Sequence, residues 1–422
     1  MKNSDNTPKP TVALLDNGMR VVACRSVGNA ASYIGVVVNA GSRDEARPVE
    51  GLAHFVEHTI FKGTLKRRSF HISNRMESIG GELNAYTSKE ETVIYTNAPV
   101  GYAERALDLL ADLVINSQFP AKELDMERTV VIEEIKSYLD SPADTVFDRF
   151  EELIYEGSGL SHNILGSPES VSRLGSDDCR AFLDRFYRPE NMVLYISDPM
   201  PVEKSLRLAE KYFGRAHFPG RGEEMSRRVL EIGQPRTTPA IRPPFRLTEG
   251  RDGYQSHTIT GCRLFPRTDP RRFALYLLNN YLGGPSMNSR LNQELRDRRG
   301  LVYSVDSNFS LLSDTGLLTI YMGSGHETVG KCLKLVDREI TRLAETELSQ
   351  RTLDKIREQF IGQMMVSADN RENRAMSMAK KLMYYGEVTD LDTQIARLRE
   401  VTPAALREVA ELLTVRSTLT LS

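Results

Sequence analysis

Two kinds of hydrophobic pattern alternate along the chain, and both recur in each half. Short β-rich runs, such as residues 32–41 (SYIGVVVNAG) and 316–325 (GLLTIYMGSG), predict strands. Long stretches with apolar positions at helical spacing follow these runs and predict helices. Residues 80–99 contain two β-rich runs around a polar turn at residues 88–91, which predicts a hairpin. We therefore expect each half to be α+β, with a mainly antiparallel sheet covered by helices.

A proline-rich stretch separates the two halves. Residues 214–244 contain prolines at positions 219, 235, 239, 243 and 244, carry mixed charges and show little helical period. We place a linker at residues 216–244, which gives one domain at residues 1–215 and a second at residues 245–422. A chain of 422 residues is long enough for two domains of ordinary size.

The two halves also match each other without a gap when Glu134 is aligned with Gln363. The identical pairs in this alignment are Leu124 with Leu353, Asp125 with Asp354, Arg128 with Arg357, Leu153 with Leu382, Tyr155 with Tyr384 and Gly157 with Gly386. This similarity predicts an internal duplication into two homologous domains. Because Ile356 and Gln363 stand where the first half has Glu127 and Glu134, we expect the chemistry to lie in the first half.

Composition narrows the classes of partner. The chain has 55 basic and 57 acidic side chains, a net charge of -2, and so has no overall positive field for a phosphate backbone. Nucleic acid is therefore not an expected partner. The four cysteines lie far apart in sequence and form no CxxC pair, which is typical of free thiols in a reducing compartment.

No segment predicts export or membrane insertion. The first ten residues, MKNSDNTPKP, lack both the apolar core of a secretory signal and the Arg-rich pattern of an organellar presequence. No later stretch approaches the about 18 consecutive apolar residues that a spanning helix needs. We expect a soluble, cytoplasmic protein without a membrane partner.

The sequence PVEGLAHFVEHTIFKGT at residues 48–64 carries the strongest chemical signal. Pro48 suits a first helical turn and Gly63 suits a helix end, so these residues predict a helix. His54 and His58 are four residues apart and project from one face, close enough for both imidazoles to bind one metal ion. Glu57 lies beside them, and a carboxylate there can act as the general base of a hydrolysis and then protonate the leaving amine. The alternative is a helix with two unrelated core or surface histidines.

Two histidines leave a tetrahedral zinc ion short of a protein ligand. The acidic helix predicted at residues 123–139 offers one, because Glu127, Val130, Val131 and Glu134 recur at helical spacing while Glu133 points toward solvent near Lys136. We assign Glu134 as the third ligand and Glu127 as the carboxylate that orients a histidine or the attacking water. The alternative is an ordinary solvated acidic face. The other histidines, expected to be structural or exposed, are His71, His162, His217, His257 and His326.

The HFVEH motif inverts the commoner HExxH order and is the signature of inverzincins. Together with ERTVVIEE at residues 127–134, it makes the chain resemble, over essentially its whole length, the pitrilysin or insulin-degrading enzyme family of zinc peptidases. In that family two histidines and a glutamate well beyond them in the chain bind zinc, and the separation of His58 and Glu134 is similar to the family's. The length is similar to the short two-domain type represented by the β subunit of the mitochondrial processing peptidase and its bacterial relatives.

The resemblance implies further site residues. It places Asn84 and Ala85 on an exposed sheet edge beside the scissile bond, where a peptide can add as a strand. It also matches Arg296 and Tyr303 to a distal motif that grips the substrate carbonyl and stabilises the oxyanion. The alternatives are an ordinary buried hairpin, a surface arginine and a strand tyrosine.

These features together predict a zinc endopeptidase that cuts oligopeptides or unfolded segments inside a closed chamber. Long members of the family join four such domains, so a two-domain chain carrying both motifs is expected to form a clamshell homodimer, or a heterodimer with a homologous chain. The rival interpretations are a non-catalytic scaffold of the same fold, a zinc-stabilised binding protein, and a specific processing peptidase that acts with a homologous partner. The short GGPSMNSRL loop at residues 283–291 differs from the long glycine-rich loop of the processing peptidase α subunit and disfavours the last of these.

Overall fold

The computed structural model describes residues 9–218, 233–251 and 253–422, and these form two compact units. Unit 1 comprises Met1–Lys136, His162–Arg236 and Ala368–Thr389; unit 2 comprises Ser137–Ser161, Thr237–Ser367 and Asp390–Ser422. Each unit therefore contains pieces from both of the predicted domains. The predicted limits at residues 215 and 245 stay a prediction, and residues 219–232 of the predicted linker lie outside the described residues.

Unit 1 is built on a six-stranded sheet of order β1-β2-β6-β3-β5-β4, antiparallel except where β2 pairs with β6. Its strands are β1 (Thr11–Leu14), β2 (Arg20–Arg25), β3 (Ala31–Val38), β4 (Glu82–Thr87), β5 (Thr92–Pro99) and β6 (Met192–Asp198). The hairpin predicted at residues 80–99 is confirmed as β4 and β5, with the turn at residues 88–91. The strand predicted at residues 32–41 is β3.

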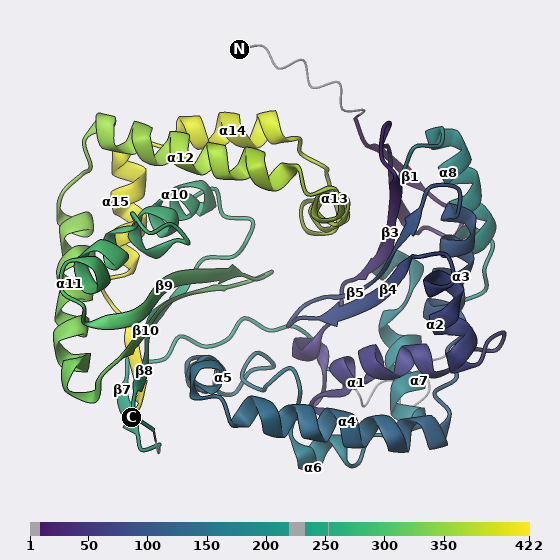
Figure 1. Ribbon diagram of the computed structural model, residues 1–422, viewed down its shortest axis with the longest axis horizontal. Coiled ribbons are helices and arrows are strands. Elements are labelled where there is room, and N and C mark those ends of the chain that lie inside the picture. Colours follow the sequence, from purple (N-terminus) through teal and green to yellow (C-terminus); the bar gives the residue numbers. More distant parts are fainter. Residues whose placement is uncertain (1–8, 219–232, 252) are drawn as a thin grey trace. The chain divides into compact units, whose positions relative to one another are not determined.

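Helices cover both faces of this sheet (Figure 1). They are α1 (Leu52–Thr59), α2 (Ser69–Glu77), α3 (Ala103–Asn116), α4 (Ala121–Leu139), α6 (Pro168–Val171), α7 (Ser176–Phe186), α8 (Val202–Ala209) and α13 (Arg371–Tyr385). Strand β3 shows why two layers are needed: Ile34, Val36 and Val38 pack into the core under α1, α3 and α7, while Val37 faces α13 on the other side. Because both faces of this strand are buried, its successive residues are apolar, and this explains the continuous apolar run in the sequence.

Unit 2 repeats this plan with a five-stranded sheet of order β7-β11-β8-β10-β9, again with one parallel pair, β7 with β11. Its strands are β7 (Arg246–Glu249), β8 (Ser256–Leu264), β9 (Val302–Leu311), β10 (Gly316–Ser324) and β11 (Ser417–Leu421). Its helices are α5 (Pro142–Ile154), α10 (Arg272–Gly283), α11 (Val329–Glu345), α12 (Gln350–Ala368), α14 (Leu391–Glu400) and α15 (Pro403–Leu412). The expected α+β fold with two similar sheet-and-helix halves is confirmed.

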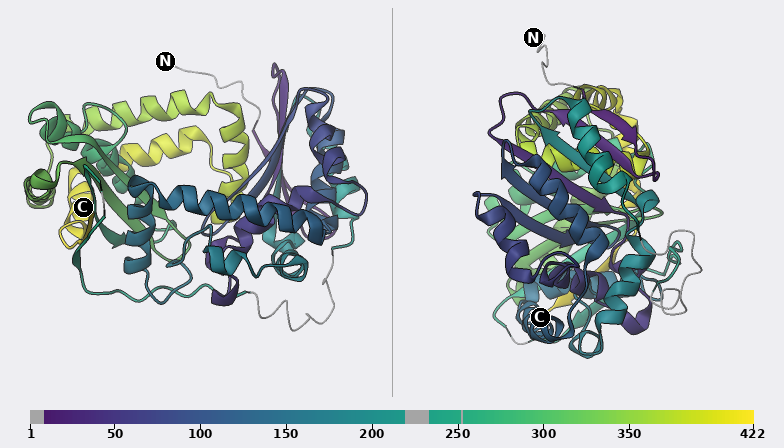
Figure 2. Two further views of the ribbon diagram at one scale, coloured as in Figure 1. Left: turned by 60° about the horizontal axis from the view of Figure 1, so that its bottom comes forward. Right: turned by 90° about the vertical axis from the view of Figure 1, so that its right-hand side faces the viewer.

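The repeat also matches in helix length. Helices α4 and α12, visible along their lengths in Figure 2, begin at positions 121 and 350 and end at positions 139 and 368, so both ends coincide in the alignment of Glu134 with Gln363. The next helices, α5 and α13, begin at positions 142 and 371, which coincide in the same alignment. Each of these two helices packs on the sheet of the unit formed mainly by the other half. The duplication therefore includes a reciprocal exchange of one helix.

The exchanged helices supply large parts of the two smaller cores. Helix α13 buries Ala375, Met378, Ala379 and Leu382 against β2, β3 and β6. Helix α5 buries Val146 and Phe150 against β8, β10 and β11. Because each sheet would otherwise expose one apolar face, neither half of the sequence contains a complete core by itself. Strands β4 and β9 occupy corresponding edges of the two sheets.

Candidate metal centre

Helix α1 carries the HFVEH motif on the side of the helix that borders β4. The helix is shorter than predicted, because Gly51 adopts a left-handed conformation (φ 90°) that separates it from the turn containing Pro48. A Cβ at position 51 would also meet the carbonyl oxygen of Leu165 at 2.6 Å, so only glycine fits. The predicted end at Gly63 is correct, since the short turn Ile60–Lys62 stops there.

The first turn of α1 is held by a buried carboxylate. Glu45 has no exposed surface and accepts hydrogen bonds from the backbone N–H groups of Gly51 (2.8 Å) and Ala53 (2.5 Å). Its other neighbour is His162, whose Nε2 lies 3.3 Å from Glu45 Oε2 and 2.8 Å from the carbonyl oxygen of Ser42. A negative charge at a helix N-terminus satisfies free N–H groups and the helix dipole. Sequence analysis assigned His162 no role beyond structure, and this structural role fixes the helix that carries both metal-ligand candidates.

His54, His58 and Glu134 converge in unit 1. The Nε2 atoms of His54 and His58 lie 3.8 Å and 3.3 Å from Glu134 Oε2, and one potential ligand atom from each of the three side chains lies within 4.8 Å of the others. Within the described part of the chain, no other group of three or more histidine, cysteine, aspartate or glutamate side chains meets this criterion. The structure thus brings together the three side chains that the sequence selected.

The spacing of these atoms fits zinc. Ligands about 2.0–2.1 Å from a tetrahedral zinc ion lie about 3.3–3.4 Å from one another. The His58 to Glu134 distance of 3.3 Å matches this value, and the His54 to Glu134 distance of 3.8 Å requires only a small closure. Two imidazoles and one carboxylate also form a catalytic zinc donor set that leaves a fourth position open.

Burial prepares His54 to act as a neutral ligand. Loss of hydration, with a smaller contribution from neighbouring His58, lowers the pKa of His54 to about 3. The ring therefore carries a free lone pair at neutral pH. The Nδ1 atom of His54 is buried and makes no hydrogen bond within the described residues, so the orientation of this ring is set by packing.

His58 contacts Glu127, the carboxylate for which we predict an orienting role. Its Nδ1 lies 3.0 Å from Glu127 Oε1, which turns Nε2 toward Glu134. Lys62, a residue that sequence analysis did not select, binds the other oxygen of Glu127 at 2.6 Å. Burial opposes ionisation of Glu127, but the Lys62 ammonium and His58 lower the pKa of this carboxyl below its ordinary value. A carboxylate that accepts the second ring N–H fixes both the tautomer and the direction of a histidine ligand.

Glu57 has an environment different from that of Glu127. Burial raises the pKa of Glu57, and nearby Glu134 acts in the same direction, whereas Thr87 and His58 favour the charged form. Thr87, the last residue of β4, lies next to this carboxyl group. Glu57 is thus a partly buried carboxyl group with a raised proton affinity beside the three metal-ligand candidates, the environment that a general base of hydrolysis requires.

Helix α4 confirms part of the predicted geometry. Glu133 is 65 % exposed and pairs with Lys136 at 2.7 Å, as expected for a solvent-facing position. Val131 is buried, but Val130 is 51 % exposed, so the interpretation of one apolar face containing both valines is wrong. Glu127 and Glu134 contact His58 of α1 instead of joining the core.

Strand β4 is the edge of the sheet in unit 1, and it carries Asn84 and Ala85. The side-chain Oδ1 of Asn84 accepts a hydrogen bond from the backbone N–H of Ala85 at 2.8 Å. That N–H group is therefore not engaged by β5. An edge with such groups can pair with an extended peptide once the side-chain bond is exchanged.

Arg296 and Tyr303 belong to unit 2 and thus to a different compact unit from the metal-ligand candidates. Arg296 lies in the turn Asn292–Asp297 and is exposed. Tyr303 lies near the start of β9, the edge strand of the five-stranded sheet, and is 46 % exposed.

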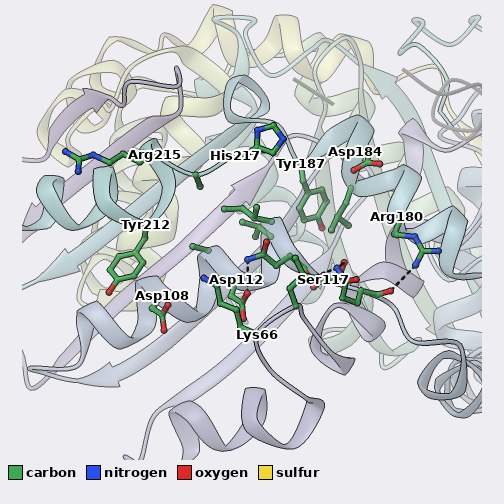
Figure 3. Close-up of a pocket in the computed structure, with 18 of the residues that line it drawn as sticks. Lys66, Asp108, Asp112, Ser117, Arg180, Asp184, Tyr187, Tyr212, Arg215 and His217 are labelled. Atoms are coloured by element: carbon green, nitrogen blue, oxygen red, sulfur yellow. Dashed lines mark hydrogen bonds between the residues drawn. The ribbon is translucent and has the colours of Figure 1, made fainter. Parts of the chain in front are cut away.

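A cavity of about 800 Å³ lies elsewhere in unit 1, beside α3, α7 and residues 211–217 (Figure 3). None of the metal-ligand candidates lines it. Its two acidic residues on α3, Asp108 and Asp112, are both bound by Arg67. The cavity therefore has no unsatisfied acidic pair on α3 and forms no part of the metal site.

Comparison with known proteins shows which family has a similar sequence. Residues 20–168 match the family model described as insulinase (peptidase family M16), and residues 173–360 match the model described as the peptidase M16 inactive domain. The uncharacterized zinc protease YmxG of Bacillus subtilis is 32 % identical over 388 residues, covering 91 % of this chain and 91 % of that protein. The chain belongs to peptidase family M16. The predicted resemblance to the insulin-degrading enzyme family is thereby confirmed.

Other similar proteins extend this result. The uncharacterized zinc protease SCO5738 of Streptomyces coelicolor is 32 % identical over 94 % of this M16 chain and 85 % of its own length. In fold, the M16 chain is similar to a protease from Helicobacter pylori, with a TM-score of 0.89, 21 % identity and coverage of 99 % and 100 % of the two chains. A protein from Pseudomonas fluorescens described as a peptidase M16 inactive domain has a TM-score of 0.87, 17 % identity and coverage of 98 % of this chain and 97 % of its own.

The described helices of this M16 chain include none with the length and apolar character needed to cross a bilayer. The four cysteines are all buried. The cytoplasmic location stays a prediction.

We predict that Glu134→Gln sharply lowers zinc occupancy while Glu133→Gln leaves it unchanged. An amide is a poor substitute for a carboxylate ligand, and Glu133 is the adjacent carboxylate on the same helix, paired with Lys136. Elemental analysis of the purified variants measures the difference. Equal zinc loss in both variants would show that Glu134 is not a ligand.

We also predict that Lys62→Met weakens zinc binding about 10-fold, because Glu127 loses the cation that fixes it against His58. Lys62→Arg, which keeps a positive charge at this position, should lose less. Exposed Lys66 provides the matched control, as Lys66→Met should bind zinc like the unaltered chain. Competition with a chelating dye measures all three affinities, and an unchanged affinity in Lys62→Met contradicts the assignment.

Proposed function

We propose that this M16 chain is a zinc endopeptidase that hydrolyses peptide bonds in oligopeptides or unfolded segments. The observation that carries the proposal is the convergence of His54, His58 and Glu134 at zinc-ligand spacing beside the carboxyl group of Glu57. The names of the relatives as zinc proteases support the same activity.

In the proposed reaction, Glu57 moves the protons. A zinc ion held by the three side chains supplies Lewis-acid polarisation of the scissile carbonyl and lowers the pKa of water in the site. Glu57 accepts a proton from the attacking water as the oxygen bonds to the carbonyl carbon. It then delivers that proton to the amide nitrogen as the C–N bond breaks, so the products are a carboxylic acid and an amine. The raised proton affinity of Glu57 suits both transfers.

The edge of β4 supports a main-chain mode of substrate binding. An extended peptide paired with β4 would run beside α1, since Thr87 at the end of this strand contacts Glu57. In this pose the peptide displaces the side chain of Asn84 from the N–H group of Ala85. Recognition through backbone groups depends weakly on side-chain identity, so length and disorder of the substrate should matter more than one preferred residue.

Arg296 and Tyr303 are proposed to stabilise the oxyanion from the second unit. We propose that they act across a homodimer, with the distal pair of one chain completing the metal site of the other inside a closed chamber. A two-fold arrangement gives two such sites in each dimer. A homologous chain in place of the second copy would make the same arrangement a heterodimer.

A non-catalytic scaffold is the main alternative. A scaffold has no need for a carboxyl group with raised proton affinity beside two histidines and a glutamate, and burying such a group carries a free-energy cost. The description of the second matched domain as inactive fits the replacement of Glu127 and Glu134 by Ile356 and Gln363 in the second half. The features of the first half therefore favour the enzyme.

The direct test combines metal content with product analysis. We expect about one zinc ion per chain and cleavage of many peptides in a mixed library, mapped by mass spectrometry. Glu57→Gln should retain zinc and lower kcat by about 10²–10⁴-fold, because the proton acceptor is lost while the ligands remain. Glu133→Gln is the matched control and should cleave at the original rate.

Two outcomes would contradict this proposal. A zinc-loaded chain that cleaves no peptide in the library would favour the scaffold. A Glu57→Gln chain with the original kcat would show that another group transfers the proton.

The cross-subunit arrangement predicts complementation between two inactive chains. Equal amounts of Glu57→Gln and of Arg296→Ala, Tyr303→Phe chains, after subunit exchange, should recover about one quarter of the activity per site, because half of the dimers are mixed and each holds one complete site. Native mass spectrometry verifies the mixed dimers. Mixed dimers that form but remain inactive would show that the distal pair does not act across the interface.

A further inference from the structure

Tyr303 is held in an unusual position on the sheet of unit 2. Strand β9 pairs with β10 in regular antiparallel register until Gly323, where the register shifts: Ser304 pairs with Gly323, but Val302 pairs with Ser324. Tyr303 is therefore the extra residue of a β-bulge. Bulges at sheet edges re-aim a side chain, and here the strand concerned is an edge.

Gly323 makes room for the ring of Tyr303. A Cβ atom at position 323 would overlap Cζ and Oη of Tyr303, so the ring lies directly over the backbone of β10. The ring is still 46 % exposed. One side of Tyr303 thus rests on the sheet while the other remains accessible.

The phenol of Tyr303 is the outer member of a chain of three neighbouring polar side chains. Tyr303 lies next to Tyr321 on β10, where burial and then Tyr303 raise the pKa of Tyr321, and the hydroxyl of Tyr321 lies 2.8 Å from Nδ1 of His257 on β8. Residues 257 and 321 stand on the same face of adjacent strands, because His257 pairs with Gly323 and Ile259 pairs with Tyr321. The chain therefore crosses the sheet from its edge to its third strand.

The two inner members are fixed in place. Tyr321 is only 7 % exposed, and its ring stacks on Phe147 of the exchanged helix α5 with centroids 5.4 Å apart. The ring of His257 also stacks on Tyr321, with centroids 6.1 Å apart, and lines a recess of about 290 Å³. Burial, followed by the nearby Arg251, lowers the pKa of His257.

We propose that Tyr321 and His257 are positioning residues that orient the phenol of Tyr303 for donation to a peptide carbonyl oxygen. This inference rests on the proposed function, in which Tyr303 contacts the substrate. Neither Tyr321 nor His257 touches the reacting atoms. They act through Tyr303, by setting the direction of its hydroxyl hydrogen.

The tautomer of His257 determines that direction. With the proton on Nδ1, His257 donates to the oxygen of Tyr321, Tyr321 donates to the oxygen of Tyr303, and the hydroxyl hydrogen of Tyr303 is free to point outward. With the proton on Nε2, Tyr321 donates to Nδ1 of His257 and Tyr303 donates to the oxygen of Tyr321. The hydroxyl hydrogen of Tyr303 is then not available to a substrate. The first arrangement leaves Nε2 as an acceptor, and His257 lines the recess. It is the arrangement that makes Tyr303 a donor.

Kinetics of single and double variants test this coupling in the zinc-loaded full-length protein. Tyr321→Phe should lower kcat about 3- to 10-fold and change KM less than about 2-fold, as expected for one lost orienting hydrogen bond. Tyr303→Phe should lower kcat about 10²-fold, and the double variant should equal Tyr303→Phe alone, because Tyr321 has nothing left to orient. Tyr254→Phe, which alters a fully exposed tyrosine of the same unit, is the control and should leave both constants unchanged.

A second pair of variants addresses His257. His257→Asn can supply a polar group near the former Nδ1 and should retain most of the activity, whereas His257→Leu should behave like Tyr321→Phe. A ¹³Cζ-tyrosine NMR spectrum provides a readout independent of catalysis: the Tyr303 signal, assigned by its loss in Tyr303→Phe, should shift in Tyr321→Phe and in His257→Leu but not in Tyr254→Phe.

Several results would overturn the inference. Independent, multiplicative losses in Tyr303→Phe and Tyr321→Phe would assign Tyr321 a purely structural role, and an unshifted Tyr303 signal in Tyr321→Phe would show that the hydrogen bond is absent. A Tyr303→Phe chain that is fully active while Glu57→Gln is inactive would remove Tyr303 from the reaction without affecting the proposed peptidase function. If the unaltered chain cleaves no peptide, the proposed function fails, and the NMR shifts alone then decide whether the chain of hydrogen bonds exists.

Discussion

The hydrogen bond between Glu127 and His58 joins the two helices on which the candidate metal centre depends. Helix α1 provides both histidines, helix α4 provides Glu134, and Glu127 is the residue of α4 that reaches back to α1 at 3.0 Å. Glu134 itself is 44 % exposed and would have little reason to stay near the histidines without this contact. Lys62 neutralises the charge that Glu127 brings into a partly buried position. The pair therefore fixes the phase and spacing of the two helices as well as the direction of one imidazole.

The reciprocal exchange of α5 and α13 places a second constraint on the chain. Each unit completes its core with a helix from the other half of the duplicated sequence. Cutting the chain at the proline-rich stretch would leave two sheets that each expose an apolar face, so the halves are expected to depend on each other for stability. In unit 2 the exchanged helix also contacts the site residues, since Phe147 of α5 stacks on Tyr321. The exchange thus contributes to the arrangement of the proposed site as well as to packing.

Sequence reasoning could predict those parts of the site that depend on local spacing. His54, Glu57 and His58 share one helix, and Glu127 and Glu134 share another, so helical periodicity alone predicts which of these side chains project from a common face. The predicted burial of Val130 on an apolar face is wrong, because helical spacing alone does not distinguish an exposed face from one that packs on a core. Lys62 stands four residues after His58, and the same spacing rule could have selected it. Tyr321 and His257 could not be found in this way, since they meet Tyr303 only through strand register and a bulge.

The duplicated helices differ at the two positions where the first copy carries carboxylates of the candidate metal centre. At the position of Glu127, unit 2 has Ile356, which is 5 % exposed and joins the core. At the position of Glu134 it has Gln363, whose amide donates a hydrogen bond to Ser286 at 2.9 Å. A carboxylate at the buried position would need a cation or several donors to offset its lost hydration, whereas isoleucine gains free energy from burial there. Where no metal ion is bound, neutral side chains are favoured at positions 356 and 363. Unit 2 retains the helix geometry, which depends on packing, and the sheet edge, which depends on backbone pairing. Tyr303 stands at that edge.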